Sequence, residues 1–123
     1  MEKKGIKSLA DLIYSPEDDL FLSKPAAISM AEKFYKKLGE EAAEKFTSFF
    51  KSNEDEIKEM FKKYLNLFSS SDLFNAMMYE KGMQRLIYRN LSMIEKDLRE
   101  NSYNLKKVYK QVEKRIKKSY SDF

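Results

Sequence analysis

Residues 87–115 have the sequence IYRNLSMIEKDLRENSYNLKKVYKQVEKR, and the spacing of their apolar side chains decides the fold. Counted in sevens from Ile87, one seam of this stretch has spacings that alternate between four and three as far as Arg115. This period is typical of a helix that lies along another helix. The seam therefore predicts the following interface residues: Ile87, Leu91, Ile94, Leu98, Asn101, Leu105, Val108 and Val112.

The partner of this seam is open at the level of sequence, because a long helix in an antiparallel bundle has nearly the same period as a coiled coil. The seam can pack inside its own chain, or it can pair with a partner helix or with a second copy in a homodimer. The helix itself also has two readings. The unbroken heptad favours one continuous rod, whereas the poor helix formers at 101–104, Asn-Ser-Tyr-Asn, favour a break.

The composition indicates a helical protein. Of the 123 residues, 42% are hydrophobic and 36% are charged, and nine Phe, eight Tyr and seven Met supply large core side chains. Only three Gly, two Pro and two Val occur, so the turns and β-branched runs that several strands require are missing. We predict an all-α bundle of four to five helices in a single domain, residues 1–123.

Within this domain, residues 1–22 form an N-terminal arm that we expect to dock on the body. Ser8 could cap a first short helical turn, and Ser15-Pro16 begins a second one. Leu20, Phe21 and Leu22 need a hydrophobic environment, which is the reason to expect docking.

Residues 23–68 predict three short helices. The first begins after Ser23, has Pro25 near its first turn and ends at Leu38, where Gly39 provides a left-handed exit. The second covers 40–51. The third opens at Asn53, which forms a pair like a capping box with Glu56.

For residues 72–119 the sequence predicts a C-terminal helix that is either one long helix or broken near Asn101 to Asn104. The Ser-rich segment 69–72 is the clearest linker in the chain, and Ser71 or Asp72 could cap the helix that follows it. Met77, Met78 and Met83 form a soft apolar cluster there. Because Met more commonly fills irregular gaps in a core than lines a binding groove, we expect this cluster to be core.

The chain lacks the residues of most active sites. It has no His and no Cys, so it contains no imidazole base, no thiol nucleophile and no ordinary zinc site, and three scattered glycines cannot form a phosphate loop. We expect a protein that is not an enzyme and has no cofactor, metal site or small-molecule substrate. The longest apolar run, Ala76 to Tyr79, is too short for a membrane span or a signal peptide, so we expect a soluble cytoplasmic protein.

Positive charge is concentrated at the C-terminal end. Residues 61–123 hold fourteen Lys and Arg against seven acids, and on a helix Lys106, Lys110, Lys114 and Lys117 lie nearly on one line. Such a line can follow phosphates, and tyrosines among the cations can stack on unpaired bases. The candidate nucleic-acid-binding residues are Arg85, Arg89, Tyr103, Lys106, Lys107, Tyr109, Lys110, Lys114, Arg115, Lys117 and Lys118.

Two functions are consistent with these features. The first is a small accessory subunit, not an enzyme, that binds DNA or RNA through phosphate contacts, within a larger nucleoprotein assembly. The second is a helical protein-interaction module, either an adaptor, an inhibitor or a self-assembling dimer, with no nucleic-acid role. The lysines also have a simpler explanation, in which they form a solvated tail that keeps the protein soluble.

Overall fold

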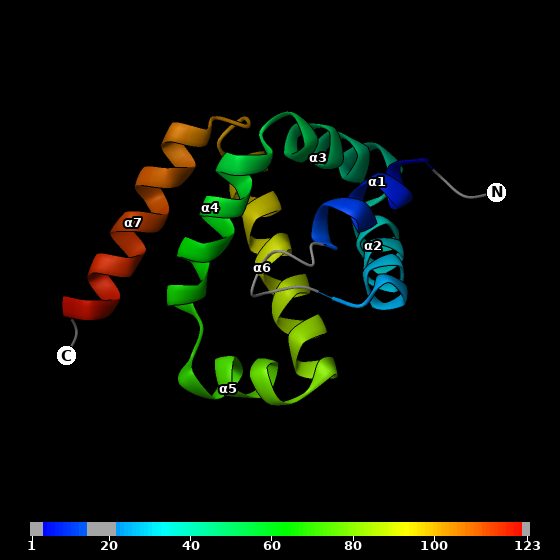
Figure 1. The fold of residues 1–123 in the computed structure, drawn as a ribbon. Helices are drawn as coiled ribbons and strands as arrows, with labels where there is room; N and C mark the ends of the chain where they lie inside the picture. Colours follow the sequence, from blue (N-terminus) through cyan, green and yellow to red (C-terminus); the bar gives the residue numbers. More distant parts are fainter. Residues whose placement is uncertain (1–3, 15–21, 122–123) are drawn as a thin grey trace.

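The computed structural model describes residues 4–14 and 22–121, and over these ranges the chain is all α-helical apart from turns and one 3-10 segment (Figure 1). The predicted fold class is confirmed. The predicted count of four to five helices is wrong, because the described residues form seven. The helices are α1 Lys4–Ile13, α2 Lys24–Leu38, α3 Glu40–Ser52, α4 Glu54–Tyr64, α5 Ser70–Met78, α6 Glu80–Glu100 and α7 Leu105–Ser121, and the 3-10 segment η1 Leu65–Leu67 follows α4.

The N-terminal arm contributes one complete helix. α1 starts four residues before Ser8, so Ser8 lies inside the helix and does not cap it. α1 packs against α2 and α3 and buries Leu9 completely, and Leu22 is also buried. The expected docking is therefore seen for residues 4–14 and for Leu22. The second expected turn, with its following apolar residues, falls on 15–21, outside the described residues.

Helix α2 begins and ends as its sequence predicts. The Ser23 side chain accepts a hydrogen bond from the backbone N–H of Ala26, and Pro25 lies in the first turn. Gly39 has φ 88° and ψ 156°, a conformation that is essentially confined to glycine. This residue allows α3 to start directly after α2 at a sharp bend.

Besides Ser8, two predicted caps are wrong. Asn53 makes no side-chain cap on α4; its amide instead donates to the carbonyl of Phe49, at the end of α3. In the Ser-rich linker, the cap of α5 is Ser69, whose hydroxyl accepts from the N–H of Asp72. In both places a polar side chain satisfies backbone groups at a helix end, but the residue or the end differs from the prediction.

The predicted long C-terminal helix is broken twice. At Tyr79 the backbone is extended, with φ −133° and ψ 136°, and this break separates α5 from α6. The two helices then contact each other through their backbones at Gly82, where an added Cβ would lie 2.3 Å from the carbonyl oxygen of Asn75. Only glycine permits this approach, which explains a tight α5–α6 hairpin that no Gly-Pro turn signal announces.

The second break is at 101–104, so the continuous-rod reading is wrong. Ser102 and Tyr103 have positive φ values of 52° and 59°, and the chain reverses direction there. The turn is held by side chains: Asn101 donates to the carbonyl of Asp97 at 2.7 Å, and Asn104 accepts from the N–H of Lys107 at 3.2 Å. In Figure 1, α4 and α7 run from top to bottom while α6 runs from bottom to top.

The core is organised around α6, which α2 contacts from one side and α4 from the other (Figure 1). Aromatic rings fill the α2–α3–α6 region: Phe34 packs on Phe46 with 5.3 Å between ring centroids and meets Tyr88 edge to face. Helix α7 packs against α4, η1 and α6 on the outer side of this body, and α5 lies across one end of it. These two peripheral helices provide the surfaces discussed next.

Candidate interaction surfaces

The heptad seam is part of the core of this chain. Ile87, Leu91, Ile94 and Leu98 on α6 are buried, as are Val108 and Val112 on α7. Two more members, Asn101 and Leu105, are half-buried at the turn. The structure therefore corresponds to the intramolecular reading of the seam, and pairing with a second chain along it would require these side chains to leave the core.

A buried polar network anchors α7. The Asp97 carboxylate on α6 is only 3% exposed and receives both guanidinium nitrogens of Arg115, Nη1 at 3.0 Å from Oδ2 and Nη2 at 3.2 Å from Oδ1. The Tyr64 hydroxyl of α4 donates to the same Oδ2. Burial, and then the bond to Asp97, raises the pKa of Tyr64 far above its ordinary value, so its proton stays in the network.

This network occupies one predicted site residue. Two guanidinium nitrogens of Arg115 bond to Asp97, which also raises the pKa of Arg115, so this fork would have to leave Asp97 to grip a phosphate. Sequence reasoning missed Asp97 and Tyr64. The signal that could have found them was Arg115 itself, since a charged residue at a seam position of a packed helix requires a buried partner.

Two other predicted site residues, Tyr103 and Arg89, also contact partners within the chain. Tyr103 packs edge to face on Phe49 at 5.1 Å, with the Lys45 ammonium 4.7 Å from its ring centroid, and burial raises its pKa to about 12. Arg89 forms an ion pair with Asp72 at 3.2 Å. Neither side chain presents the free ring face or free guanidinium that the nucleic-acid reading required. Arg85 is exposed.

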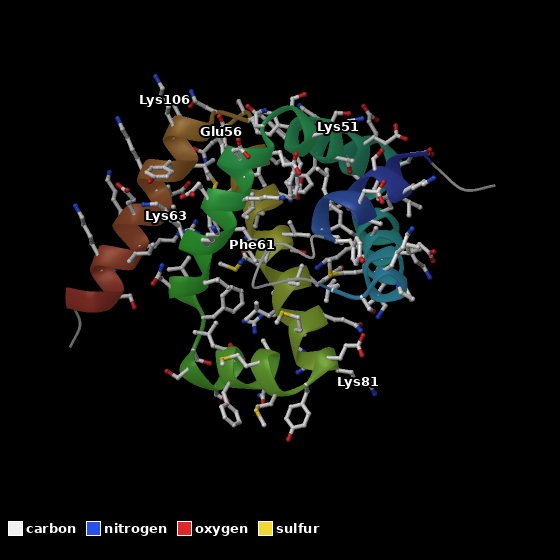
Figure 2. The ribbon with its side chains drawn as sticks, viewed as in Figure 1. Lys51, Glu56, Phe61, Lys63, Lys81 and Lys106 are labelled. Carbon is white, nitrogen blue, oxygen red and sulfur yellow. The ribbon has the colours of Figure 1, made fainter. Side chains whose placement is uncertain are left out.

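Tyr109 lies over the groove between α4 and α7. It is 38% exposed, and the Lys63 ammonium of α4 lies 4.2 Å from its ring centroid. Lys63 also forms an ion pair with Glu113 at 2.9 Å, and Figure 2 shows it between the two helices. The ring of Tyr109 is therefore part of the α4–α7 contact more than a platform for a base.

Five exposed lysines lie on the solvent side of α7, and we call them the α7 lysine face: Lys106, Lys107, Lys110, Lys114 and Lys117. Within the part of the chain that the structure describes, none of these five side chains forms an ion pair; Lys118 has an interaction partner and is not included. Figure 2 shows Lys106 extending away from the body. From Lys106 to Lys117 the helix rises roughly 16 Å, far less than the rod of about 50 Å that an unbroken helix would provide.

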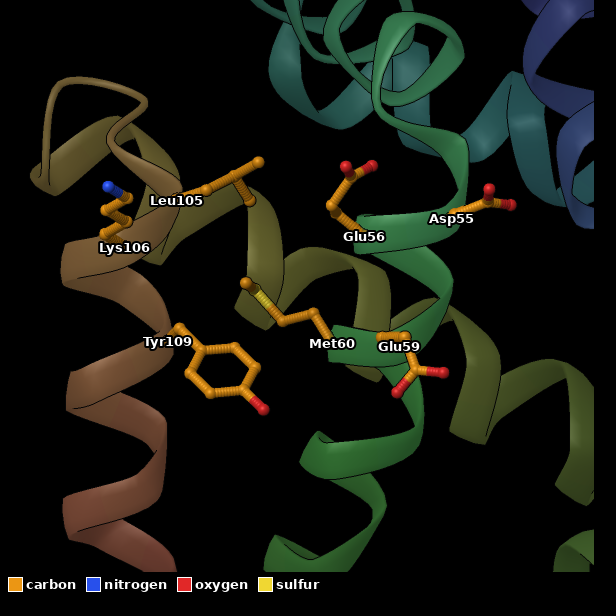
Figure 3. A pocket seen from close by; sticks show the side chains of 7 residues that line it. All are labelled: Asp55, Glu56, Glu59, Met60, Leu105, Lys106 and Tyr109. Atoms are coloured by element: carbon orange, nitrogen blue, oxygen red, sulfur yellow. The ribbon is translucent and has the colours of Figure 1, made fainter.

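An acidic wall, formed by the carboxylates of Asp55, Glu56 and Glu59 on α4, lies beside Lys106. A pocket of about 350 Å³ lies between α4 and α7 and is lined by Asp55, Glu56, Glu59, Met60, Leu105, Lys106 and Tyr109 (Figure 3). Its carboxylates come from the first turns of α4, where negative charge suits the helix dipole. In residues 4–14 and 22–121, no group of three or more acids could hold a metal ion. The wall lowers the positive potential at this end of the lysine face.

The most apolar exposed surface is on α5. Phe74 is 59% exposed, Met77 80%, Met78 60% and the following Tyr79 63%, and Figure 2 shows side chains of α5 extending away from the body. We call these four residues the α5 cap. The expectation that Met77 and Met78 are core is wrong, whereas Met83 does pack against the core. Sequence reasoning missed Tyr79 because the helix was expected to continue through it.

The inner side of α5 explains why the cap faces outward. Leu73 packs against the core and Ala76 is buried on the inner side of α5, and at Gly82 the α6 backbone lies against Asn75, so α5 approaches α6 closely at this point. Asp72, the one charged residue of α5, is paired with Arg89 of α6. The remaining exposed surface of α5 is therefore uncharged, and its large side chains are apolar.

Comparison of the chain with protein-family models, with curated proteins and with solved structures finds no match. Over the described ranges, every helix is too short or too polar to cross a bilayer. The functional argument therefore rests on the two surfaces themselves, the α5 cap and the α7 lysine face.

Proposed function

We propose that this protein is a helical protein-interaction module, not an enzyme, and that the α5 cap is its docking surface. One observation supports the proposal most directly: four large apolar side chains, three on the short helix α5 and one directly after its end, are each more than half exposed. At about 200 Å² for each side chain, these fractions leave on the order of 500 Å² of apolar surface in water. Patches of this size are as large as the largest on typical monomers and are often functional.

The energetics of the cap favour a protein partner. At about 25 cal/mol per Å², covering this area yields on the order of 12 kcal/mol before the costs of association, which are about 4 to 15 kcal/mol. Met side chains adapt their shape to a partner, and Phe and Tyr are common at the centres of interfaces. The cap by itself therefore supports an interaction of modest affinity, and polar contacts at its rim add to it.

The proposal can be tested by photo-cross-linking. A benzoylphenylalanine at position 77, in the centre of the cap, should form discrete adducts when the full chain is irradiated in the cells that make it. The matched control carries the same group at position 96, where the exposed Lys96 lies on a charged surface of α6. Equal labelling at both positions, or no adduct at 77, would contradict docking through α5.

A second candidate function, polyanion binding, is favoured by the α7 lysine face. Five exposed lysines without described ion pairs can contact phosphates, but without Arg115 and the tyrosines they offer charge and little recognition of bases. We therefore expect any binding to nucleic acid to be independent of sequence. Its affinity should depend on salt with a logarithmic slope no steeper than about −4.5, the value for five phosphate contacts on duplex DNA.

Charge reversal tests this second function. Lys110→Glu, Lys114→Glu and Lys117→Glu together should abolish binding to mixed-sequence DNA and RNA at about 50 mM salt. The matched control reverses three exposed lysines elsewhere, Lys33, Lys36 and Lys51, and has the same net charge. If both triple variants lose binding equally, the effect is one of net charge and the α7 lysine face has no special role.

A further inference from the structure

We infer that the occupant of the α5 cap is the α5 cap of a second copy of this chain, packed about a twofold axis. The inference rests on the proposed function, since it names the partner of the same surface. It differs from the sequence-based homodimer hypothesis, in which the heptad seam forms the interface. Here the seam stays inside each copy and the contact is made at the other end of α6.

The area of the cap matches a homodimer interface. A standard interface covers about 800 Å² on each partner, and the interfaces of homodimers are about 65% apolar, more than those of transient complexes. The cap provides on the order of 500 Å² of apolar surface, which is roughly 60% of such an area. The polar remainder is available from exposed, uncharged neighbours on α5, namely Ser70, Ser71 and Asn75.

The charge of the cap also favours self-pairing. A twofold axis brings each surface against its own equivalent, so a charged surface repels itself. In this chain 36% of residues are charged, yet the cap has no charged side chain and the single acid of α5, Asp72, is neutralised by Arg89. The α5 surface is thus one that can meet its own copy without placing like charges together.

The cap is also held in its exposed position before any partner binds. The Ser69 hydroxyl caps the first turn of α5, and the Asp72–Arg89 ion pair and the close backbone approach at Gly82 hold α5 against α6. Association then orders only the side chains of the cap, and the backbone loses little further entropy. A preformed helix at one end of the molecule can pack antiparallel on its copy, as two helices commonly do.

Sedimentation velocity of the purified full chain tests the inference. The mass should rise with concentration from 14.6 kDa toward twice that value. Met77→Asp and Phe74→Asp should each raise the dissociation constant by about 100-fold or more, because they bury an unpaired charge on both sides of the axis. Since both side chains are exposed in the single chain, circular dichroism should show unchanged folding. The matched control is Ile28→Asp, an exposed apolar residue on α2, which should leave the dimer intact.

Cysteine cross-linking locates the contact. The chain has no Cys, so Met77→Cys introduces a single reactive thiol, and a short bismaleimide should link two copies. Ile28→Cys is the matched control and should give no dimer. Equal cross-linking of the two variants would overturn the placement of the axis at α5.

The outcomes separate this inference from the proposed function. A chain that stays at 14.6 kDa up to about 1 mM overturns the self-pairing inference, since that concentration corresponds to only about 4 kcal/mol of association free energy. If the position-77 photo-cross-link then gives an adduct with a different protein, docking through α5 still holds. If it gives none, both the inference and the proposed function fall.

Discussion

Replacing Asp97 by Asn removes the charge at the centre of the network that attaches α7 to α6 and α4. The shape of the side chain is almost unchanged, so the perturbation is mainly electrostatic. Asp97 is 3% exposed and accepts two hydrogen bonds from Arg115 and one from Tyr64. An asparagine can accept at one oxygen only, and its amide group then faces a guanidinium nitrogen, which is also a donor.

The magnitude follows from burial on each side of the pair. Breaking a fully buried ion pair costs about 3 to 5 kcal/mol, because a charge is left without its partner. The Arg115 side chain is 38% exposed, so water can solvate part of the guanidinium, and we reduce the expected loss of unfolding free energy to about 2 to 3 kcal/mol. For a chain of this length the loss corresponds to a fall in Tm of roughly 10 °C.

Urea unfolding followed by circular dichroism measures this loss, and hydrogen exchange shows where it acts. We expect the amides of α7 to lose protection before those of α6, because Asp97 attaches α7 to a core that remains packed. A double-mutant cycle with Arg115→Met should give a coupling of about 1 to 2 kcal/mol. The matched control is Glu113→Gln, which removes the half-buried Lys63–Glu113 pair between α4 and α7 and should cost at most about 1 kcal/mol. The reasoning is refuted if Asp97→Asn costs no more than this control, or if the cycle is additive.

Three further predictions concern the hairpin, the turn and the α5 cap. In urea unfolding, Gly82→Ala should destabilise the chain by about 1 to 3 kcal/mol although Ala is the better helix former, because the new Cβ would lie 2.3 Å from the Asn75 carbonyl oxygen. A neutral or stabilising result would show that α5 moves freely. The pKa of Tyr103 is raised from 10.0 to about 12, so the contribution of its burial to stability is complete below about pH 10 and is lost as the pH rises to about 12. The Tyr103→Phe variant should therefore lose less stability than the parent chain between about pH 9 and about pH 11.5, and an identical loss would count against burial of the phenol. Dilute peroxide should oxidise Met77 and Met78 before the buried Met30 and Met60, as peptide mass spectrometry can show, and oxidation of all four at one rate would contradict the exposed α5 cap. If two copies pair through the α5 cap, a higher protein concentration should slow the oxidation of Met77 and Met78.

Several elements could be predicted from local sequence alone. α2 with its Ser23 cap, and the glycine exit at Gly39, depend on residues within a few positions of one another. The lysines of the α7 solvent side also follow from helical spacing, since a single period decides which side chains share a face. The all-α class followed from the scarcity of Gly, Pro and Val.

Other features could not be predicted because they depend on contacts between distant residues. The heptad continues without a fault through Asn101, yet the chain turns there, because α7 packs back on α4 and α6 and because Asn101 and Asn104 satisfy the backbone at the turn. Arg115 was interpreted as a cation for phosphates. Its real neighbour, Asp97, is eighteen residues away, and no short-range pattern links the two.

For this protein, composition and periodicity by themselves determined the all-α class, the apolar seam and the cationic side of the last helix, because these depend only on composition and on spacing along one helix. Tertiary structure alone decided which apolar residues are buried and which cations are free. The α5 cap illustrates the difference: Met77 and Met78 have the same intrinsic hydrophobicity as the buried Met30 and Met60, but α5 packs on the body through Leu73 and Ala76, and no described element covers its other side. Burial depends on which surface another element covers, and that is a property of the packed molecule.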